Sequence, residues 1–247
     1  MILTYDYLET VFAAKGYKWY PDNINLIGIR SSIQAPNTFN DLFVVAFKVP
    51  IMPASFTNRI DVQQHFLNVF GYRDINGNTL KEDGKLGTNT MFALSKYKQE
   101  INIKKIMVFP ITTDPGTYWL NHPLNTLGTA VLVPGQYLNV YQIGYHKQDT
   151  SHRALVQTGA KVTVYRDNDK ESYAEPVNLK ETGFFGINTH RAKSTGETIT
   201  IDKFSAGCQV FARASDLAEV LELCGFWKVV NNNLYTYTLL DEKNDLK

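Results

Sequence analysis

The sequence predicts a mainly β fold, α+β overall, with a small α-helical module inserted between two strands of one β-rich domain. Before residue 50, apolar runs rich in Val, Ile and Phe lie between turn-forming residues, which is typical of strands. From residue 51 to 104 the apolar residues instead take helical spacing. From residue 105 onward short apolar runs return, separated by Gly, Pro, Asn and Asp. We therefore expect residues 1–50 and 105–247 to form one domain and residues 51–104 to be an insertion in it.

The β-rich domain is expected to contain strands at several places along the chain, namely residues 26–30, 42–49, 106–111, 137–143, 154–157, 161–166 and 198–201. A short helix is expected at residues 5–15. Another should begin at Ser215 and end before Gly225, because Ser often caps a helix start and Gly often follows a helix end. The chain is then expected to finish with a hairpin of residues 226–230 and 234–240.

The inserted segment shows two helical patterns. Val62, Phe66 and Val69 are spaced as on one face of a helix, which Gly71 would end. A turn-rich stretch follows, and a second helix is expected at about residues 89–99. These patterns predict a compact helical module.

Composition excludes several classes of function. The chain has 247 residues, a formal net charge of +1 and a pI of about 7.7, with no run of five or six like charges, so no nucleic-acid surface is expected. No apolar run reaches the roughly 18 residues of a membrane span. The first residues lack the basic and apolar regions of a signal peptide, so synthesis in the cytoplasm without one is expected. No P-loop, dinucleotide fingerprint or paired metal-ligand spacing is present, and we expect neither a cofactor nor a metal.

Two segments of the β-rich domain carry a possible cysteine-based site. Residues 186–190 end in His190, and residues 205–210 contain Ser205, Gly207 and Cys208. A nucleophilic cysteine needs a base and donors for the oxyanion, which backbone N–H groups in a glycine-containing turn supply. Two neighbouring strands are expected to bring His190 and Cys208 side by side.

This pattern, His followed by Ser-x-Gly-Cys, resembles the active-site signature of L,D-transpeptidases with a YkuD-type catalytic domain. The resemblance covers roughly residues 105–215 and implies a β-sandwich fold. It also implies that Cys208 attacks a stem-peptide carbonyl of peptidoglycan and that His190 is its base. The thioacyl-enzyme then passes its acyl group to an amine or to water. By the same resemblance Gly207 lies beside the oxyanion site and Ser205 steadies the loop.

The sequence departs from the family pattern at the positions that contact substrate. Ala206 stands where the family usually has His, and Val210 where Arg is common. Arg213 is a candidate replacement as a carboxylate anchor, and Arg191 follows the histidine in place of glycine. The full set of candidate substrate-binding residues is Arg213, Arg191, His146, Tyr137 and Asn188.

The insertion is similar to the small peptidoglycan-binding domain. The similarity rests on Asp83-Gly84, on Gly87 with Thr90, and on a following helix that ends near Tyr97. The resemblance implies that peptidoglycan is the partner, through its stem peptides at the β-rich domain and through glycan at residues 51–104.

The sequence is compatible with three functions. The first is an L,D-transpeptidase-type enzyme, and the second is an L,D-carboxypeptidase or endopeptidase of the same fold. The third is a non-enzymatic cell-wall-binding or virion structural protein, in which Cys208 is only a small buried residue. Cys224 lies on the apolar face of an expected helix and is predicted to be core. The missing signal peptide suggests a phage or prophage product, such as an endolysin, that acts at the cell wall.

Overall fold

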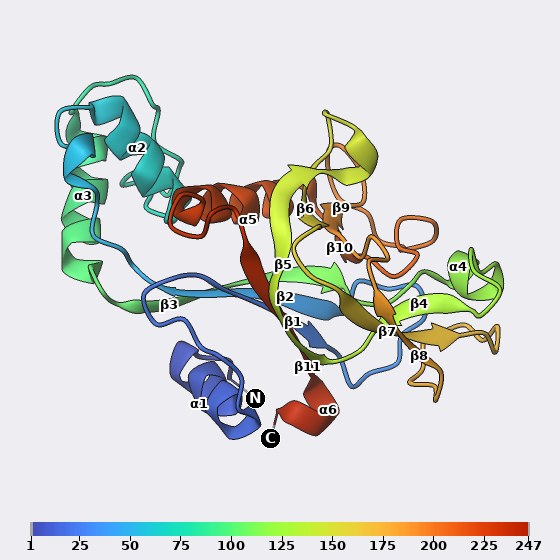
Figure 1. The fold of residues 1–247 in the computed structure, drawn as a ribbon. Coiled ribbons are helices and arrows are strands. Elements are labelled where there is room, and N and C mark those ends of the chain that lie inside the picture. The colour runs from blue at the N-terminus through green and yellow to red at the C-terminus, as the bar shows by residue number, and fades with distance from the viewer. Residues whose placement is uncertain (1, 247) are drawn as a thin grey trace. The chain divides into compact units, whose positions relative to one another are not determined.

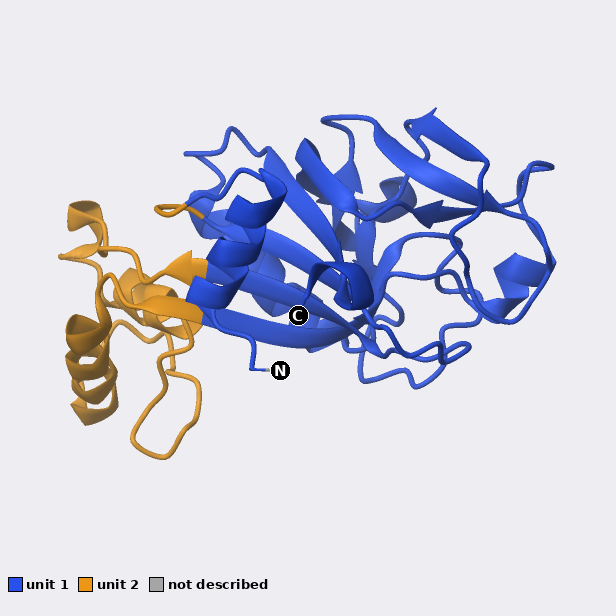
Figure 2. Ribbon diagram, turned by 90° about the horizontal axis from the view of Figure 1, so that it is seen from below, with its two compact units in different colours: residues 1–20, 24–46, 106–247 blue, residues 21–23, 47–105 orange. Residues whose placement is uncertain are grey.

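A computed structural model describes residues 2–246, and the chain divides into two compact units. Unit 1 comprises residues 1–20, 24–46 and 106–247, and unit 2 comprises residues 21–23 and 47–105 (Figure 2). The expected insertion was residues 51–104. In the described part of the chain no helix has the length and apolar character needed to cross a membrane.

Eight strands close into a barrel in the order β1-β11-β5-β6-β9-β10-β3-β2. Their bounds are Asn25–Arg30 (β1), Asp41–Lys48 (β2), Lys104–Thr112 (β3), Gly135–Tyr145 (β5), Arg153–Gln157 (β6), Thr189–Arg191 (β9), Gln209–Phe211 (β10) and Tyr235–Asp241 (β11). β1 pairs in parallel with β11 and antiparallel with β2. The expected mainly β, α+β class is confirmed. The strand pairing shows a closed barrel where a sandwich of two sheets was expected.

Buried aromatic rings tie the barrel strands together. Phe43 of β2 contacts Phe211 of β10 at a ring-centroid distance of 5.0 Å, and Tyr237 of β11 lies 5.5 Å from Tyr141 of β5. All four side chains are fully buried. A Cβ at Gly28 would lie 1.9 Å from the Tyr237 hydroxyl oxygen, so glycine in β1 makes room for this ring.

A second sheet of three strands lies in the same unit, at the right of Figure 1. It has the order β4-β7-β8, with β4 at Thr129–Leu132, β7 at Val162–Asp167 and β8 at Lys180–Gly183. The short helix α4 (Thr117–Asn121) precedes β4. Side chains from this sheet contribute to the cavity described below.

Helix α1 (Tyr5–Lys15) matches its expected bounds. The Thr4 side chain accepts a hydrogen bond from the N–H of Tyr7, and Gly16 ends the helix with φ 67°, a left-handed conformation that glycine adopts at low cost. Two further short elements are η2 (His146–Gln148) and α6 (Glu242–Asp245).

Two predictions near the C-terminus are wrong. Helix α5 spans Ala214–Trp227, so Gly225 lies inside it and residues 226–230 are not a strand. Its face of buried residues continues past the glycine to Trp227, which shows that packing outweighs the helix-ending tendency of one glycine. Residues 198–201 also form no strand; only an isolated bridge joins Glu197 to Arg213.

Unit 2 contains the short helix η1 (Ala54–Phe56) and helices α2 (Ile60–Val69) and α3 (Thr88–Glu100). Its core is aromatic. The Phe66 ring lies 4.7 Å from Phe70 and 5.3 Å from Tyr97, and all three are buried. The two helices agree with the helical spacing of the sequence, since Phe66 and Phe70 are one turn apart.

Candidate active site

The loop that carries Cys208 is held by one buried serine. The Ser205 hydroxyl donates to the Cys208 carbonyl at 2.8 Å and accepts the Gly207 N–H at 3.2 Å. Gly207 has φ 122°, and a Cβ there would lie 2.3 Å from the Ala130 carbonyl oxygen. The loop therefore needs glycine for both its backbone conformation and its close contact with β4. The two hydrogen bonds of Ser205 tie together the backbone of residues 205–208.

Strand pairing brings the segments of Cys208 and His190 together. β9 and β10 run parallel, with Gln209 beside Thr189 and Val210 beside His190. Cys208 immediately precedes β10, so its loop lies next to the strand that carries His190. Both residues line one cavity of about 670 Å³.

Cys208 is partly exposed, and its thiol is a neutral group in this setting. Sγ lies 3.3 Å from the Gly186 carbonyl oxygen, to which the thiol donates. Burial raises the pKa of the Cys208 thiol to about 11, opposed by the Asn188 N–H and the charge of Lys147. Neither cysteine forms a disulfide, and Cys224 is fully buried, as expected for a core residue.

His190 is positioned as a base. Its Nδ1 lies 2.8 Å from the Arg191 carbonyl oxygen. A carbonyl only accepts hydrogen bonds, so Nδ1 carries the proton and Nε2 keeps its lone pair. Desolvation and the neighbouring His146 lower the pKa of His190 to about 3. The imidazole is therefore neutral at pH 7 and able to accept a proton.

Two further histidines pack against His190. The ring of His146 stacks on it, with 4.0 Å between centroids and 26° between planes. His152 lies 5.3 Å from His190 and 5.0 Å from His146. Burial lowers the pKa of His146 to about 4 and also lowers that of His152. We call His146, His152 and His190 the histidine cluster.

The cavity is basic. Lys147, Arg166 and Lys203 line it, and no aspartate or glutamate of the described residues does. Arg166 pairs with Glu181, which does not line the cavity, and its guanidinium carbon lies 4.8 Å from the centroid of the Phe185 ring. Such a lining favours a ligand that carries negative charge.

The expected substrate-binding residues divide into two groups. His146 and Asn188 line the cavity, whereas Arg191, Arg213 and Tyr137 do not. Arg213 pairs with Glu197 at 3.1 Å, and Arg191 donates to the Ser151 carbonyl. The Tyr137 hydroxyl donates to the Val133 carbonyl at 2.6 Å. These three side chains form an ion pair or hydrogen bonds outside the cavity.

The expected oxyanion donors need one correction. Backbone N–H groups of the glycine-containing turn around Gly207 and Cys208 were expected to bind the substrate oxygen, and the Gly207 N–H is one of them. That N–H instead donates to Ser205 Oγ, so it is not available to a ligand in this arrangement. The Cys208 N–H has no acceptor among the described residues.

Sequence reasoning missed the cationic residues and one member of the histidine cluster. Lys147, Arg166 and Lys203 come from three separate segments, and no local spacing links them to Cys208. His152 had a weak signal, since it lies six positions after His146 across a turn between expected strands. A hairpin in that place brings two such residues together.

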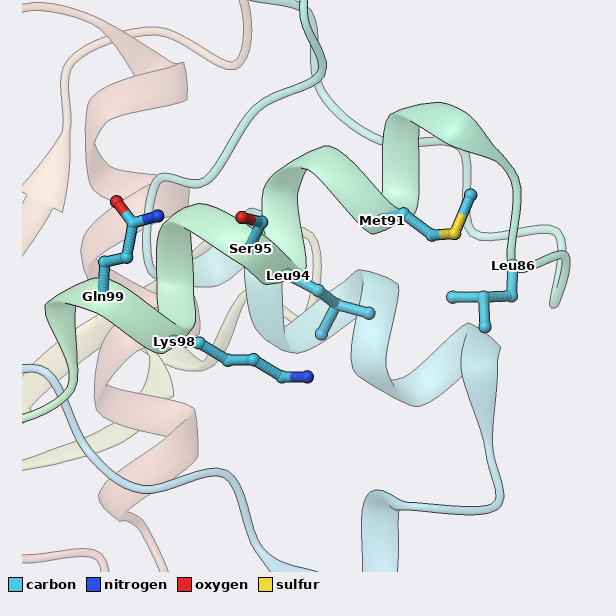
Figure 3. Close-up of a pocket in the computed structure, with 6 residues that line it drawn as sticks. All are labelled: Leu86, Met91, Leu94, Ser95, Lys98 and Gln99. Carbon is cyan, nitrogen blue, oxygen red and sulfur yellow. The ribbon is translucent and has the colours of Figure 1, made fainter.

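Unit 2 has an open groove along α3 (Figure 3). It is lined by Leu86, Met91, Leu94, Ser95, Lys98 and Gln99 and has a volume of about 480 Å³. Leu86 and Met91 are 53% and 51% exposed, which makes them an apolar surface open to solvent.

The described residues contain no group of three or more His, Cys, Asp or Glu side chains arranged to hold a metal ion. Comparison with known proteins finds no matching family model, no matching curated protein and no matching solved structure.

Proposed function

We propose that this protein is a cysteine acyl-transfer enzyme that acts on peptidoglycan stem peptides, of the L,D-transpeptidase type. The observation that carries the proposal is that Cys208 and His190 line one cavity. His190 Nε2 bears no proton there and can accept one, because Nδ1 donates to the Arg191 carbonyl. A partly exposed thiol and a neutral imidazole that line one cavity are the two groups that nucleophilic attack on a carbonyl needs.

The reaction follows from the protonation states. As Cys208 Sγ bonds to the substrate carbonyl carbon, its proton passes to His190 Nε2, and the carbonyl oxygen becomes an oxyanion. When this intermediate collapses, the carbon–nitrogen bond breaks and the leaving amine takes that proton. A thioester on Cys208 remains, and an incoming amine or water resolves it.

The basic lining supports an anionic acyl donor. Stem peptides carry free carboxylates, and Lys147 and Lys203 have no carboxylate partner among the described residues. Binding such a ligand therefore breaks no existing ion pair at these two lysines. The proposal includes action at the cell wall.

Glycan binding by unit 2 is a separate part of the proposal. The groove along α3 offers exposed Leu86 and Met91 beside the polar Ser95, Lys98 and Gln99. Apolar surface with adjacent hydrogen-bonding groups suits a sugar chain.

The experiment is mass spectrometry of purified muropeptides after incubation with the wild-type protein and with Cys208→Ala. The proposal predicts new products with wild type and none with the variant. Cross-linked products indicate transfer to an amine, whereas a gain of one water indicates hydrolysis. Cys224→Ala is the matched control and should keep the activity. Equal turnover by Cys208→Ala and wild type would overturn the proposal.

A further inference from the structure

On the loop of residues 205–208, one backbone N–H that could bind an oxyanion is already used. The N–H of Gly207 is held by Ser205 Oγ at 3.2 Å, which leaves the Cys208 N–H as the donor on that loop. Oxyanion sites ordinarily offer more than one preorganised donor. A second donor would come from a side chain that lines the same cavity.

The amide of Asn188 has a fixed orientation. The backbone N–H of Gln157 donates to Asn188 Oδ1 at 2.8 Å. An N–H donor requires an oxygen acceptor there, so the other atom of the amide is the nitrogen. That nitrogen, Nδ2, lies 3.1 Å from His146 Nδ1.

The orientation of Asn188 sets the tautomer of His146. Because Nδ2 of Asn188 donates, Nδ1 of His146 accepts and bears no proton. The neutral ring then carries its proton on Nε2. His190 has the opposite tautomer, since its Nδ1 donates to the Arg191 carbonyl. Two stacked rings in one cavity thus provide a proton acceptor and a hydrogen-bond donor.

We propose that His146 is a second catalytic histidine, whose Nε2–H donates a hydrogen bond to the substrate carbonyl oxygen as it becomes the oxyanion. This inference rests on the proposed acyl-transfer function and adds a role to a residue of the same cavity. No proton moves at His146 in the step: the thiol proton goes to His190, and His146 remains neutral throughout. The donor hydrogen bond strengthens as charge develops on the oxygen.

The surroundings keep His146 in place. His146 is 9% exposed, and its ring contacts the rings of both His190 and His152. Its backbone N–H donates to the His152 carbonyl at 2.9 Å. The charge of Lys147 lowers the pKa of His146, and that of Asp149 raises it.

The first test reads the tautomers without any substrate. Long-range ¹H–¹⁵N NMR of histidine-labelled protein at pH 7 should show the proton on Nε2 of His146 and on Nδ1 of His190, with assignment by His146→Gln and His190→Gln. In Asn188→Asp the donor becomes an acceptor, so the His146 proton should move to Nδ1. A wild-type His146 protonated on Nδ1 would overturn the inference, whether or not the protein turns over muropeptides.

The second test separates the oxyanion role from activation of the thiol. His146→Ala should lower the turnover rate of muropeptides about 100- to 1000-fold, while iodoacetamide alkylates Cys208 at a rate within about threefold of wild type. His146→Gln should recover part of the turnover because its amide can donate. His65→Gln, at an exposed histidine of unit 2 outside the cavity lining, is the matched control and should keep the wild-type turnover. If His146→Ala slows alkylation and turnover equally, His146 acts on the thiol and the inference fails.

Discussion

The protonation state of Cys208 follows from its environment. Its thiol is partly buried, donates to the Gly186 carbonyl, and has a pKa raised to about 11. With the pKa of His190 lowered to about 3 by desolvation, the resting pair is a neutral thiol and a neutral imidazole at pH 7. The proton therefore moves during attack and not before it.

We expect the alkylation rate of Cys208 by iodoacetamide to rise continuously from pH 7 to pH 10, because only the thiolate reacts. Quantifying the modified peptide by mass spectrometry measures this rate. Cys224 is fully buried and should remain unmodified in the native protein, so it is an internal control. A rate that is constant between pH 6 and pH 8 would instead indicate a preformed thiolate–imidazolium pair and contradict the account.

The histidine cluster predicts loss of stability in acid. A lowered pKa means that the unfolded chain binds protons more readily than the folded one, so the free energy of unfolding falls as pH drops below about 6.5. For His146 and His190, with pKa values of about 4 and about 3, the combined loss between pH 7 and pH 4.5 should be about 2 to 5 kcal/mol. Denaturant unfolding at both pH values measures it.

Two variants check the source of this acid sensitivity. His146→Leu removes one buried imidazole and should shrink the difference between pH 7 and pH 4.5 by about 1 to 2 kcal/mol. His122→Gln alters an exposed histidine outside the cluster and should leave the difference unchanged. The same loss in all three proteins would show that other groups control the acid response.

The conformation of the loop of residues 205–208 requires glycine at position 207. Gly207→Ala would bring a Cβ to 2.3 Å from the Ala130 carbonyl oxygen at a φ of 122°. We expect it to lower the free energy of unfolding by about 2 to 4 kcal/mol and to slow muropeptide turnover. Thermal unfolding and product analysis measure the two effects.

Gly225→Ala is the matched control for this loop variant. Gly225 lies in α5 with nothing within 4 Å of an added Cβ. Alanine in a helix interior should raise the stability by about 0.5 to 1 kcal/mol. If Gly207→Ala were equally harmless, the close approach of this loop to β4 would not be needed.

The local spacing of apolar residues predicted the presence of helices and strands better than it predicted where they end. The helix at residues 5–15 and the strand-like runs near β1, β2 and β3 were readable because their apolar spacing is local. The hairpin expected at 226–230 failed because burial of Trp227 extends α5 beyond Gly225. Propensity at one residue gives way when packing favours a longer helix.

Closure of the barrel could not be predicted from the spacing of apolar residues along the sequence. β1 and β11, from opposite ends of the chain, pair in parallel, and no local signal specifies such a long-range contact. The cationic residues of the cavity could not be predicted for the same reason, because Lys147, Arg166 and Lys203 come together only in the folded chain. That Cys208 and His190 line one cavity agrees with the expectation that neighbouring strands carry their two segments.

The insertion allows a test of the division into two units. The Val49 N–H donates to the Ile103 carbonyl and the Asn102 N–H donates to the Val49 carbonyl, each at 2.9 Å, so the ends of the insertion lie together. A chain with residues 51–101 replaced by a short Gly-Ser linker should therefore keep its fold and its turnover of soluble muropeptides. Its binding to intact peptidoglycan in a pull-down should fall at least tenfold.

A milder variant isolates the groove along α3. Met91→Glu and Leu86→Glu alter exposed positions and should weaken binding to intact peptidoglycan without changing the melting temperature. Glu82→Gln, also in unit 2 but outside the groove lining, is the control. Unchanged binding in both groove variants would leave unit 2 without a glycan role.

Intact-protein mass spectrometry after rapid quenching with a soluble muropeptide tests the central claim, that Cys208 and His190 form a nucleophile–base pair. The account predicts a covalent acyl adduct on wild type that maps to Cys208, is cleaved by hydroxylamine, and is absent in Cys208→Ala. In His190→Ala the adduct should form at least 100-fold more slowly. Turnover of the muropeptide with no adduct on Cys208, or adduct formation at the wild-type rate in His190→Ala, would contradict the account.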